Sequence, residues 1–219
     1  MKKVIAILAA LALLAGCVAL ADAAQVGPAS DVNMETYGTE DCTVHVAIDA
    51  SAIEADGDEL TYLVYGMDTY TAEAIRGLQA GDGLYINGEQ MTVETVEESE
   101  NGFDVNGGFI GEETEGEGAT LVYVEGSTEV LCSTLYDGML AYTLQGEVTY
   151  PFADEVTVTT YKWEEDGDFA GNYDVQTLPA AEVKAYLGTT GVSYDYSNTT
   201  LTLKDGKVTE IKVEWAPNV

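Results

Sequence analysis

The stretch LTLKDGKVTEIKVEW, Leu201 to Trp215, decides the fold class of this chain. Apolar and polar residues alternate on both sides of the pair Asp205–Gly206. Alternation with a period of two places one set of side chains on each face of a strand. An Asp-Gly pair accepts the positive φ values of a tight turn. The stretch therefore predicts a β-hairpin.

Further Asx-Gly pairs separate alternating segments elsewhere in the chain. They begin at Asp56, Asp82, Asn87, Asn101, Asn106, Asp137 and Asp166. Helical signals are few: Thr71 to Leu78 has Thr71 as N-cap, and Pro179 to Leu187 has a first-position proline with Gly188 just past its end. We expect an all-β protein, mainly an antiparallel sandwich or barrel, with one or two short helices.

The N-terminus has the features of an export signal. Lys2 and Lys3 precede the apolar stretch Val4 to Leu14, and small residues follow. The alternative is a transmembrane anchor, but the apolar stretch is at the lower limit for spanning and no positive flank follows it. We expect residues 1–24 to be a signal peptide.

Two processing sites compete within this signal. Leu14 to Cys17, LAGC, resembles the bacterial lipobox, whose cysteine is diacylated and becomes the new N-terminus. The resemblance implies a lipoprotein that begins at Cys17 and is held at the outer face of the cytoplasmic membrane, since two acyl chains anchor stably. Ala21 to Ala23, ADA, is an ordinary cleavage pattern and would release the protein.

Two cysteines, Cys42 and Cys132, remain once Cys17 is lipidated or removed. An even number in an exported protein favours a disulfide. Its loop of about 90 residues would contribute roughly 4–5 kcal/mol of stability. Two buried thiols are the alternative. A zinc site has little support, because the chain has no CxxC motif and only His45 to help.

The charge balance limits the partners. The chain has 39 acidic and 8 basic residues, a net charge of −31. Nucleic acid is excluded as a partner because no basic patch could neutralise phosphates, and contact with anionic lipid heads is disfavoured. Such a surface attracts cations and basic partners. It also resembles the acid-rich surfaces of salt-adapted proteins.

Composition suggests how the chain is organised. Residues 25–42 have little periodicity and are predicted to be a tether. Between the leader and Tyr161 the only basic residue is Arg76, and the others lie from Lys162 onward. This favours a β domain over residues 43–161 and a smaller C-terminal β subdomain with a short helix over residues 162–219. One continuous sandwich or barrel is the alternative.

The segment LQAGDGLYINGEQMTVETVEESENGFDVNGG, Leu78 to Gly108, resembles one found in exported β-rich proteins of prokaryotes whose function is uncharacterised. The resemblance covers about 31 residues and rests on the spacing of the GD, NG and NGG turns. It implies a surface protein and brings no catalytic residue with it.

Calcium is the ionic ligand that the sequence favours most. In DGDFAGNYD, Asp166, Asp168, Gly171 and Asp174 match positions 1, 3, 6 and 9 of a twelve-residue calcium loop. Thr177 stands where that loop has its bidentate glutamate. A solvated acidic hairpin is the alternative, and no other cofactor is expected.

Aromatic residues on a β scaffold could form a carbohydrate-binding face or a protein interface. The candidates are Tyr62, Tyr65, Tyr70, Tyr194, Tyr196 and Trp215. The alternative is that these side chains fill half-buried strand positions, as tyrosine commonly does in β proteins.

The sequence offers few residues from which a catalytic site could be built. His45 is the only histidine, and Cys42 falls on the opposite face of a regular strand. Paired carboxylates could serve a glycosidase, but no spacing singles out a pair. We expect a non-catalytic, acidic binding or interaction lipoprotein of the cell surface, whose partner is a glycan, a cation or a basic protein. The alternatives are a carboxylate-based hydrolase acting on glycan and a structural envelope protein adapted to salt.

Overall fold

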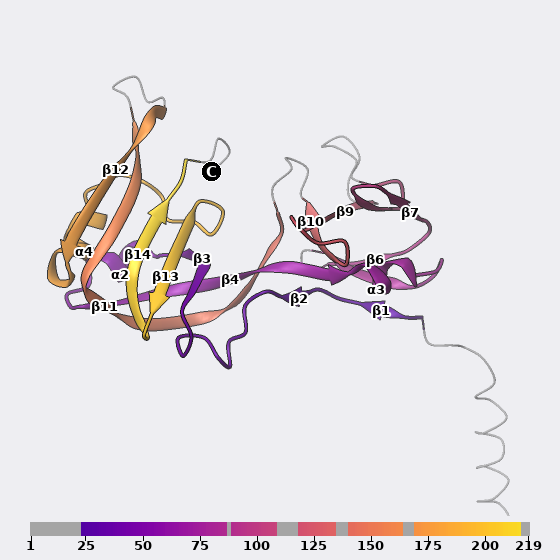
Figure 1. The fold of residues 1–219 in the computed structure, drawn as a ribbon, viewed down its shortest axis with the longest axis horizontal. Coiled ribbons are helices and arrows are strands. Elements are labelled where there is room, and N and C mark those ends of the chain that lie inside the picture. Colours follow the sequence, from indigo (N-terminus) through magenta and orange to yellow (C-terminus); the bar gives the residue numbers. More distant parts are fainter. Residues whose placement is uncertain (1–22, 87–88, 109–117, 135–139, 164–168, 216–219) are drawn as a thin grey trace, which may run out of the picture. The chain divides into compact units, whose positions relative to one another are not determined.

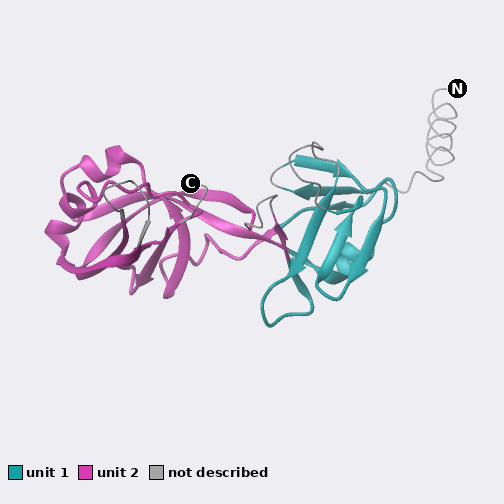
Figure 2. Ribbon diagram, turned by 90° about the horizontal axis from the view of Figure 1, so that it is seen from above, with its two compact units in different colours: residues 1–28, 70–131 teal, residues 29–69, 132–219 magenta. Residues whose placement is uncertain are grey.

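The computed structural model describes residues 23–86, 89–108, 118–134, 140–163 and 169–215 (Figure 1). The chain divides into two compact units (Figure 2). Unit 1 takes residues 1–28 and 70–131, and unit 2 takes residues 29–69 and 132–219. Each unit has its own cluster of buried hydrophobic residues. Most of unit 1 is thus one segment of chain between the two parts of unit 2.

Unit 1 consists of short strands and one short helix. The strands are β1 (Gln25–Val26), β5 (Gly83–Ile86), β6 (Glu89–Thr92), β7 (Val96–Ser99), β8 (Gly102–Val105), β9 (Ala119–Tyr123) and the start of β10 (Val130–Thr134). β1 pairs with β5 in parallel and β5 with β6 in antiparallel fashion, whereas β7, β8 and β9 form an antiparallel meander. Helix α3 (Ala72–Arg76) buries Ile75 in a core that includes Phe103 and Leu121.

Unit 2 is built from longer strands and two helices. Its elements are β2 (Ala29–Ser30), β3 (Cys42–Ala47), α2 (Ala50–Glu54), β4 (Glu59–Thr71), β11 (Tyr142–Trp163), β12 (Phe169–Pro179), α4 (Ala180–Leu187), β13 (Thr199–Lys204) and β14 (Lys207–Val213). The pairings run from β11 through β14, β13 and β3 to β4, and β4 pairs again with β11. These five strands therefore form a closed circuit, to which β12 adds along β11.

The first half of β11 pairs with β4, and its second half pairs with β12 and β14. The register of β11 shifts at Gly146 in its pairing with β4, and between Phe152 and Thr157 in its pairing with β14. Such irregularities bend a long strand, so that its two halves can pair with different neighbours. The core enclosed by the circuit includes Val46, Leu60 and Val158.

The predicted hairpin is present as β13 and β14. Asp205 and Gly206 have φ values of 49° and 69°, so both turn residues are left-handed, as a two-residue turn requires. Leu201 and Ile211 face each other across the ladder and are completely buried. The polar residues between them, such as Thr202, lie on the opposite face and are partly exposed.

The β-rich fold class is confirmed, with two differences. The sheets are mixed, because β1–β5 and β11–β14 are parallel pairs. The described residues also contain three helices: the predicted α3 and α4, and the unexpected α2. Asp49 caps α2 by accepting a hydrogen bond from the backbone amide of Ser51, at 2.7 Å.

The organisation of the chain differs from the sequence-based expectation. Residues 25–42 were expected to form a tether, but they contain β1 and β2, and Tyr37 is buried in the core of unit 2. The expected boundary at residue 162 lies inside β11, within unit 2. A local rise in basic residues marked the boundary in the sequence, whereas strand pairing between distant segments sets it in the structure.

Candidate functional site

A loop over residues 31–41 joins β2 to β3 and is fastened to unit 2 by Tyr37. The Tyr37 hydroxyl shares a hydrogen bond of 2.9 Å with the Tyr62 hydroxyl inside the core. The Tyr150 hydroxyl donates to the Tyr37 carbonyl at 2.9 Å, and the two rings meet edge to face. Burial raises the pKa of Tyr37 and Tyr62 far above the usual value, so both phenols stay neutral. The loop is thus held at its middle.

Gly38 allows the loop to turn directly after this anchor. Its φ is 78°, in the left-handed region that favours glycine. A Cβ at this position would collide with the hydroxyl of Tyr150. The position therefore needs glycine both for its backbone conformation and for the close approach of Tyr150.

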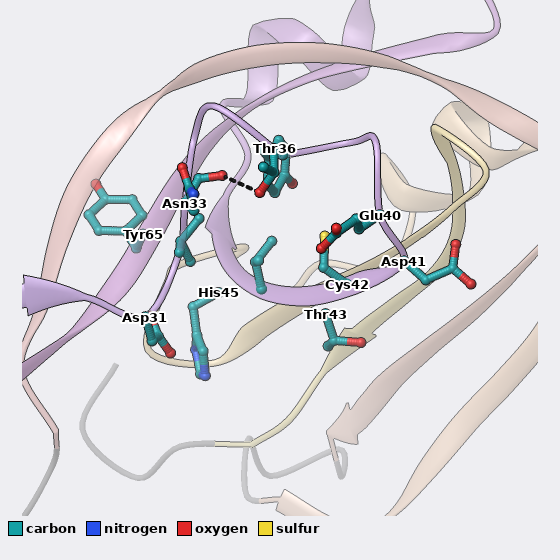
Figure 3. A pocket seen from close by; sticks show the side chains of 12 residues that line it. Asp31, Asn33, Thr36, Glu40, Asp41, Cys42, Thr43, His45 and Tyr65 are labelled. Atoms are coloured by element: carbon teal, nitrogen blue, oxygen red, sulfur yellow. Dashed lines mark hydrogen bonds between the residues drawn. The ribbon is translucent and has the colours of Figure 1, made fainter. Parts of the chain in front are cut away.

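The loop encloses a pocket of about 270 Å³ in unit 2 (Figure 3). It is lined by Asp31, Val32, Asn33, Thr36, Tyr37, Glu40, Asp41, Cys42, Thr43, Val44, His45 and Tyr65. Three of these side chains are carboxylates, and none is a lysine or an arginine. Figure 3 shows Asp31 and Asp41 on opposite sides of the pocket. Its walls combine negative charge with apolar surface.

Backbone amides fix two of the three carboxylates. Asp31 Oδ1 accepts from the amide of Met67 at 2.7 Å, and Asp41 Oδ1 accepts from the amide of Asp205 at 3.1 Å. Within the described part of the chain, the second oxygen of each makes no hydrogen bond, and neither does the Glu40 carboxylate. All three carboxylates are exposed, so the negative charge beside the pocket lies at the surface of unit 2.

His45 belongs to an aromatic cluster at one side of the pocket. Its Nδ1 lies 2.7 Å from the carbonyl oxygen of Tyr196, so Nδ1 carries a proton. Its Nε2 lies 3.1 Å from the hydroxyl of Tyr142, and the two rings lie 4.3 Å apart. Both ring nitrogens are engaged, so His45 is neither an exposed general base nor a ready metal ligand. The Cys42 thiol is no thiolate nucleophile, because burial raises its pKa.

The six aromatic candidates do not form one binding face. Tyr62, Tyr70 and Tyr194 are buried, and the hydroxyls of the last two donate to backbone carbonyls. Tyr65 and Tyr196 stack on each other with ring centres 4.4 Å apart. Trp215 is 37% exposed. Only Tyr65 lines the pocket, so the aromatic residues serve mainly as packing.

The predicted disulfide is absent from the structure. Cys42 lies in β3 and Cys132 in β10, and β4 comes between these strands in the sheet order. Adjacent strands lie about 4.8 Å apart, so two spacings exceed the roughly 7 Å that a disulfide allows between Cα atoms. Burial raises the pKa of the Cys132 thiol. The lipidation candidate Cys17 lies outside the described residues.

The structure describes only part of the predicted calcium loop. Asp166 and Asp168 lie outside the described residues, whereas Asp174 lies on β12. Its carboxylate accepts from the Tyr186 hydroxyl at 2.8 Å and from Gln176, and it pairs with Lys162 at 3.3 Å. These hydrogen bonds and the lysine hold the pKa of Asp174 below its usual range. Among the described residues, no three His, Cys, Asp or Glu side chains are grouped so that they could hold a metal.

The pocket was missed because its loop lacks the periodicity of a strand or helix. One feature could have indicated it: Tyr37–Gly38, a bulky aromatic followed by glycine, stands inside the polar run NMETYGTED. A large side chain in such a run is often an anchor to a core. Its partners, Tyr62 and Tyr150, are distant in sequence and could not be identified from the loop alone.

Comparison with known proteins gives no information about this site. The chain matches no family model, no curated protein and no solved structure. No helix in the described ranges is long and apolar enough to cross a membrane.

Proposed function

We propose that this protein is a non-catalytic binding protein of the cell envelope, exported by its leader and anchored through a lipid on Cys17. The observation that supports binding is the pocket inside the loop 31–41. Its walls are preorganised by Tyr37 in the core and by the two backbone amides that fix Asp31 and Asp41. A preformed pocket with a few fixed polar groups is the common form of a small-ligand site.

The geometry around the pocket favours binding over turnover. A nucleophilic mechanism needs an activated nucleophile with a base beside it. Here the Cys42 thiol is protonated and both nitrogens of His45 are engaged. The carboxylates Asp31 and Asp41 are hydrogen-bonded to the backbone, which suits a fixed electrostatic role.

The function is tested by screening the purified mature protein against glycans, basic peptides and small cations, with product analysis on every compound. We expect saturable binding without turnover, weakened by filling the pocket with Thr36→Trp and retained in Thr39→Trp, a change on the same loop outside the lining. Carboxylate-dependent cleavage of a glycan would overturn the proposal, as would binding that is insensitive to Thr36→Trp.

The anchor is tested by intact-mass analysis of the protein expressed with its leader in a bacterial host. A mature chain that starts at Cys17 and carries acyl mass supports the lipoprotein. A start near Ala24, unchanged in Cys17→Ala, would refute it and leave a released protein.

A further inference from the structure

Strand β12 lies at the border of the sheet in unit 2 (Figure 1). In the described part of the chain it pairs with β11 along one edge, and no strand pairs with its other edge. Helix α4 packs on a face of this ribbon, where the Tyr186 hydroxyl contacts both Asp174 on β12 and its paired neighbour Thr160 on β11. The free edge of β12 therefore presents backbone N–H and C=O groups to another strand.

The sequence of β12 lacks the features that usually protect such an edge. Proteins prevent unwanted pairing with charged side chains, prolines or very short border strands. β12 reads FAGNYDVQTLP: it is 11 residues long, its proline stands at the last position, and its one charged residue is Asp174. That carboxylate is paired with Lys162 at 3.3 Å. The strand itself thus presents no unbalanced charge.

A border strand of unit 1 shows the protected alternative. β7, at the other end of the sheet order, is four residues long and reads VEES, with Glu97 and Glu98 inside the strand. In a chain with a net charge of −31, such an edge repels any acidic strand that approaches. β12 differs from β7 in length and in charge, within the same molecule.

β12 also offers apolar surface to a partner. Val175 is 60% exposed and Tyr173 is 41% exposed, and Val175 is more exposed than any other large hydrophobic side chain of the described residues. Both lie on the face of the strand opposite to Asp174, and so away from α4. Acidic residues of neighbouring strands, Glu155 on β11 and Glu210 on β14, lie one and two strands in from the border. The acidic run 164–168, which precedes β12, lies outside the described residues.

The residues of β12 are suited to pairing with a second copy of the same strand. In an antiparallel pair about a twofold axis, one residue faces its own copy and the others pair symmetrically around it. A pair centred on Val175 places Tyr173 opposite Thr177 and Asp174 opposite Gln176, an amide that donates to this carboxylate within one chain. No charges of like sign then face each other. A pair centred on Asp174 would place two carboxylates opposite each other, which is unfavourable.

We propose that β12 is the interface of a homodimer, in which the β12 strands of two copies pair in antiparallel fashion about Val175. The low charge of the edge argues for a second copy, because an edge made for a basic partner would be rich in carboxylates. One such contact uses both free edges, so association ends at the dimer. This inference concerns assembly and does not depend on the pocket in the loop 31–41.

The oligomeric state tests the inference, measured by sedimentation velocity on the mature protein over a range of concentrations. We expect the mass to rise to that of two chains and no further. Val175→Lys sets two ammonium groups against each other and should weaken the dimer at least about tenfold. Leu144→Lys makes the same change at a residue that is 50% exposed on β11, away from β12, and should leave the dimer intact. Thermal unfolding checks that both variants are folded.

Cysteine cross-linking tests the register. The two copies of residue 175 have Cα atoms about 4.5–5.5 Å apart in this pair, which is within the range of a disulfide. Two copies of residue 177 are offset by four residues, roughly 14 Å along the strands. We therefore expect mild oxidation to link Val175→Cys into a covalent dimer and to leave Thr177→Cys unlinked.

Four results would overturn the inference. They are a monomer at every concentration, growth beyond the dimer, equal weakening by Val175→Lys and Leu144→Lys, and equal cross-linking at residues 175 and 177. A monomer that instead takes up an extended peptide, and loses it in Val175→Lys, would assign the edge of β12 to another protein.

Discussion

Asp68 shows how one buried carboxylate affects the stability of unit 2. The residue lies on β4 with 1% of its surface exposed, and its Oδ2 has no hydrogen-bond partner among the described residues. Burial raises its pKa, a hydrogen bond with Thr143 opposes the rise, and the nearby charge of Asp31 adds to it. The folded protein therefore binds this proton more tightly than the unfolded chain. The free energy of unfolding then falls as pH rises through the folded-state pKa.

Asp68→Asn should remove this loss, because the amide keeps the shape of the side chain and cannot ionise. We expect the variant to be more stable than the native protein at pH 7, by about 1 kcal/mol or more, which corresponds to an unfolding midpoint raised by roughly 2–4 °C per kcal/mol. The gain should shrink towards pH 4. Thermal unfolding from pH 4 to pH 8 measures it, with the exposed Asp58→Asn as control; parallel profiles for all three proteins would contradict it.

At the scale of elements, the hairpin β13–β14 could be predicted from local sequence and the pocket loop could not. The hairpin needs only alternation and a turn pair, Asp205–Gly206, which lie within one stretch of chain. The loop 31–41 gets its shape from Tyr37, whose partners Tyr62 and Tyr150 lie on β4 and β11. The same limit applies to the parallel pairing of β11 with β14, which local pattern does not encode.

The hairpin β13–β14 also contributes its apolar face to the core of unit 2. Leu201 is completely buried between Val44 on β3 and Ile211 on β14. Leu201→Ala should cost about 2–5 kcal/mol. Thr200→Ala, one residue away on the partly exposed face, should cost less than about 1 kcal/mol. Urea unfolding of both variants measures the difference; equal losses would mean that the two faces are not distinguished as described.

For the molecule as a whole, repulsion between carboxylates outweighs attraction to bases. The net charge is −31, and the described residues show only four ion pairs, all of them largely exposed. Exposed pairs contribute little, whereas salt shortens the range of repulsion from about 10 Å at 0.1 M to 3 Å at 1 M.

Salt should therefore stabilise this protein. Raising sodium chloride from about 0.05 M to 1 M should relieve roughly 1–2 kcal/mol of repulsion and raise the unfolding midpoint by about 2–8 °C. Scanning calorimetry checks this, with sucrose of equal osmolality separating charge screening from general exclusion. An unfolding midpoint that stays constant or falls as salt is added would show that repulsion between carboxylates does not destabilise the protein.

The order in which the chain is made bears on how the two units form. Thr43 on β3 and Thr202 on β13 share a hydrogen bond across 159 positions of sequence, so the strand circuit of unit 2 cannot close until β13 and β14 have left the ribosome. Most of unit 1 lies between residues 70 and 131 and can acquire its meander much earlier. During synthesis, the edge of β3 that pairs with β13 and the edge of β4 that pairs with β11 therefore stay unpaired until those strands have been translated.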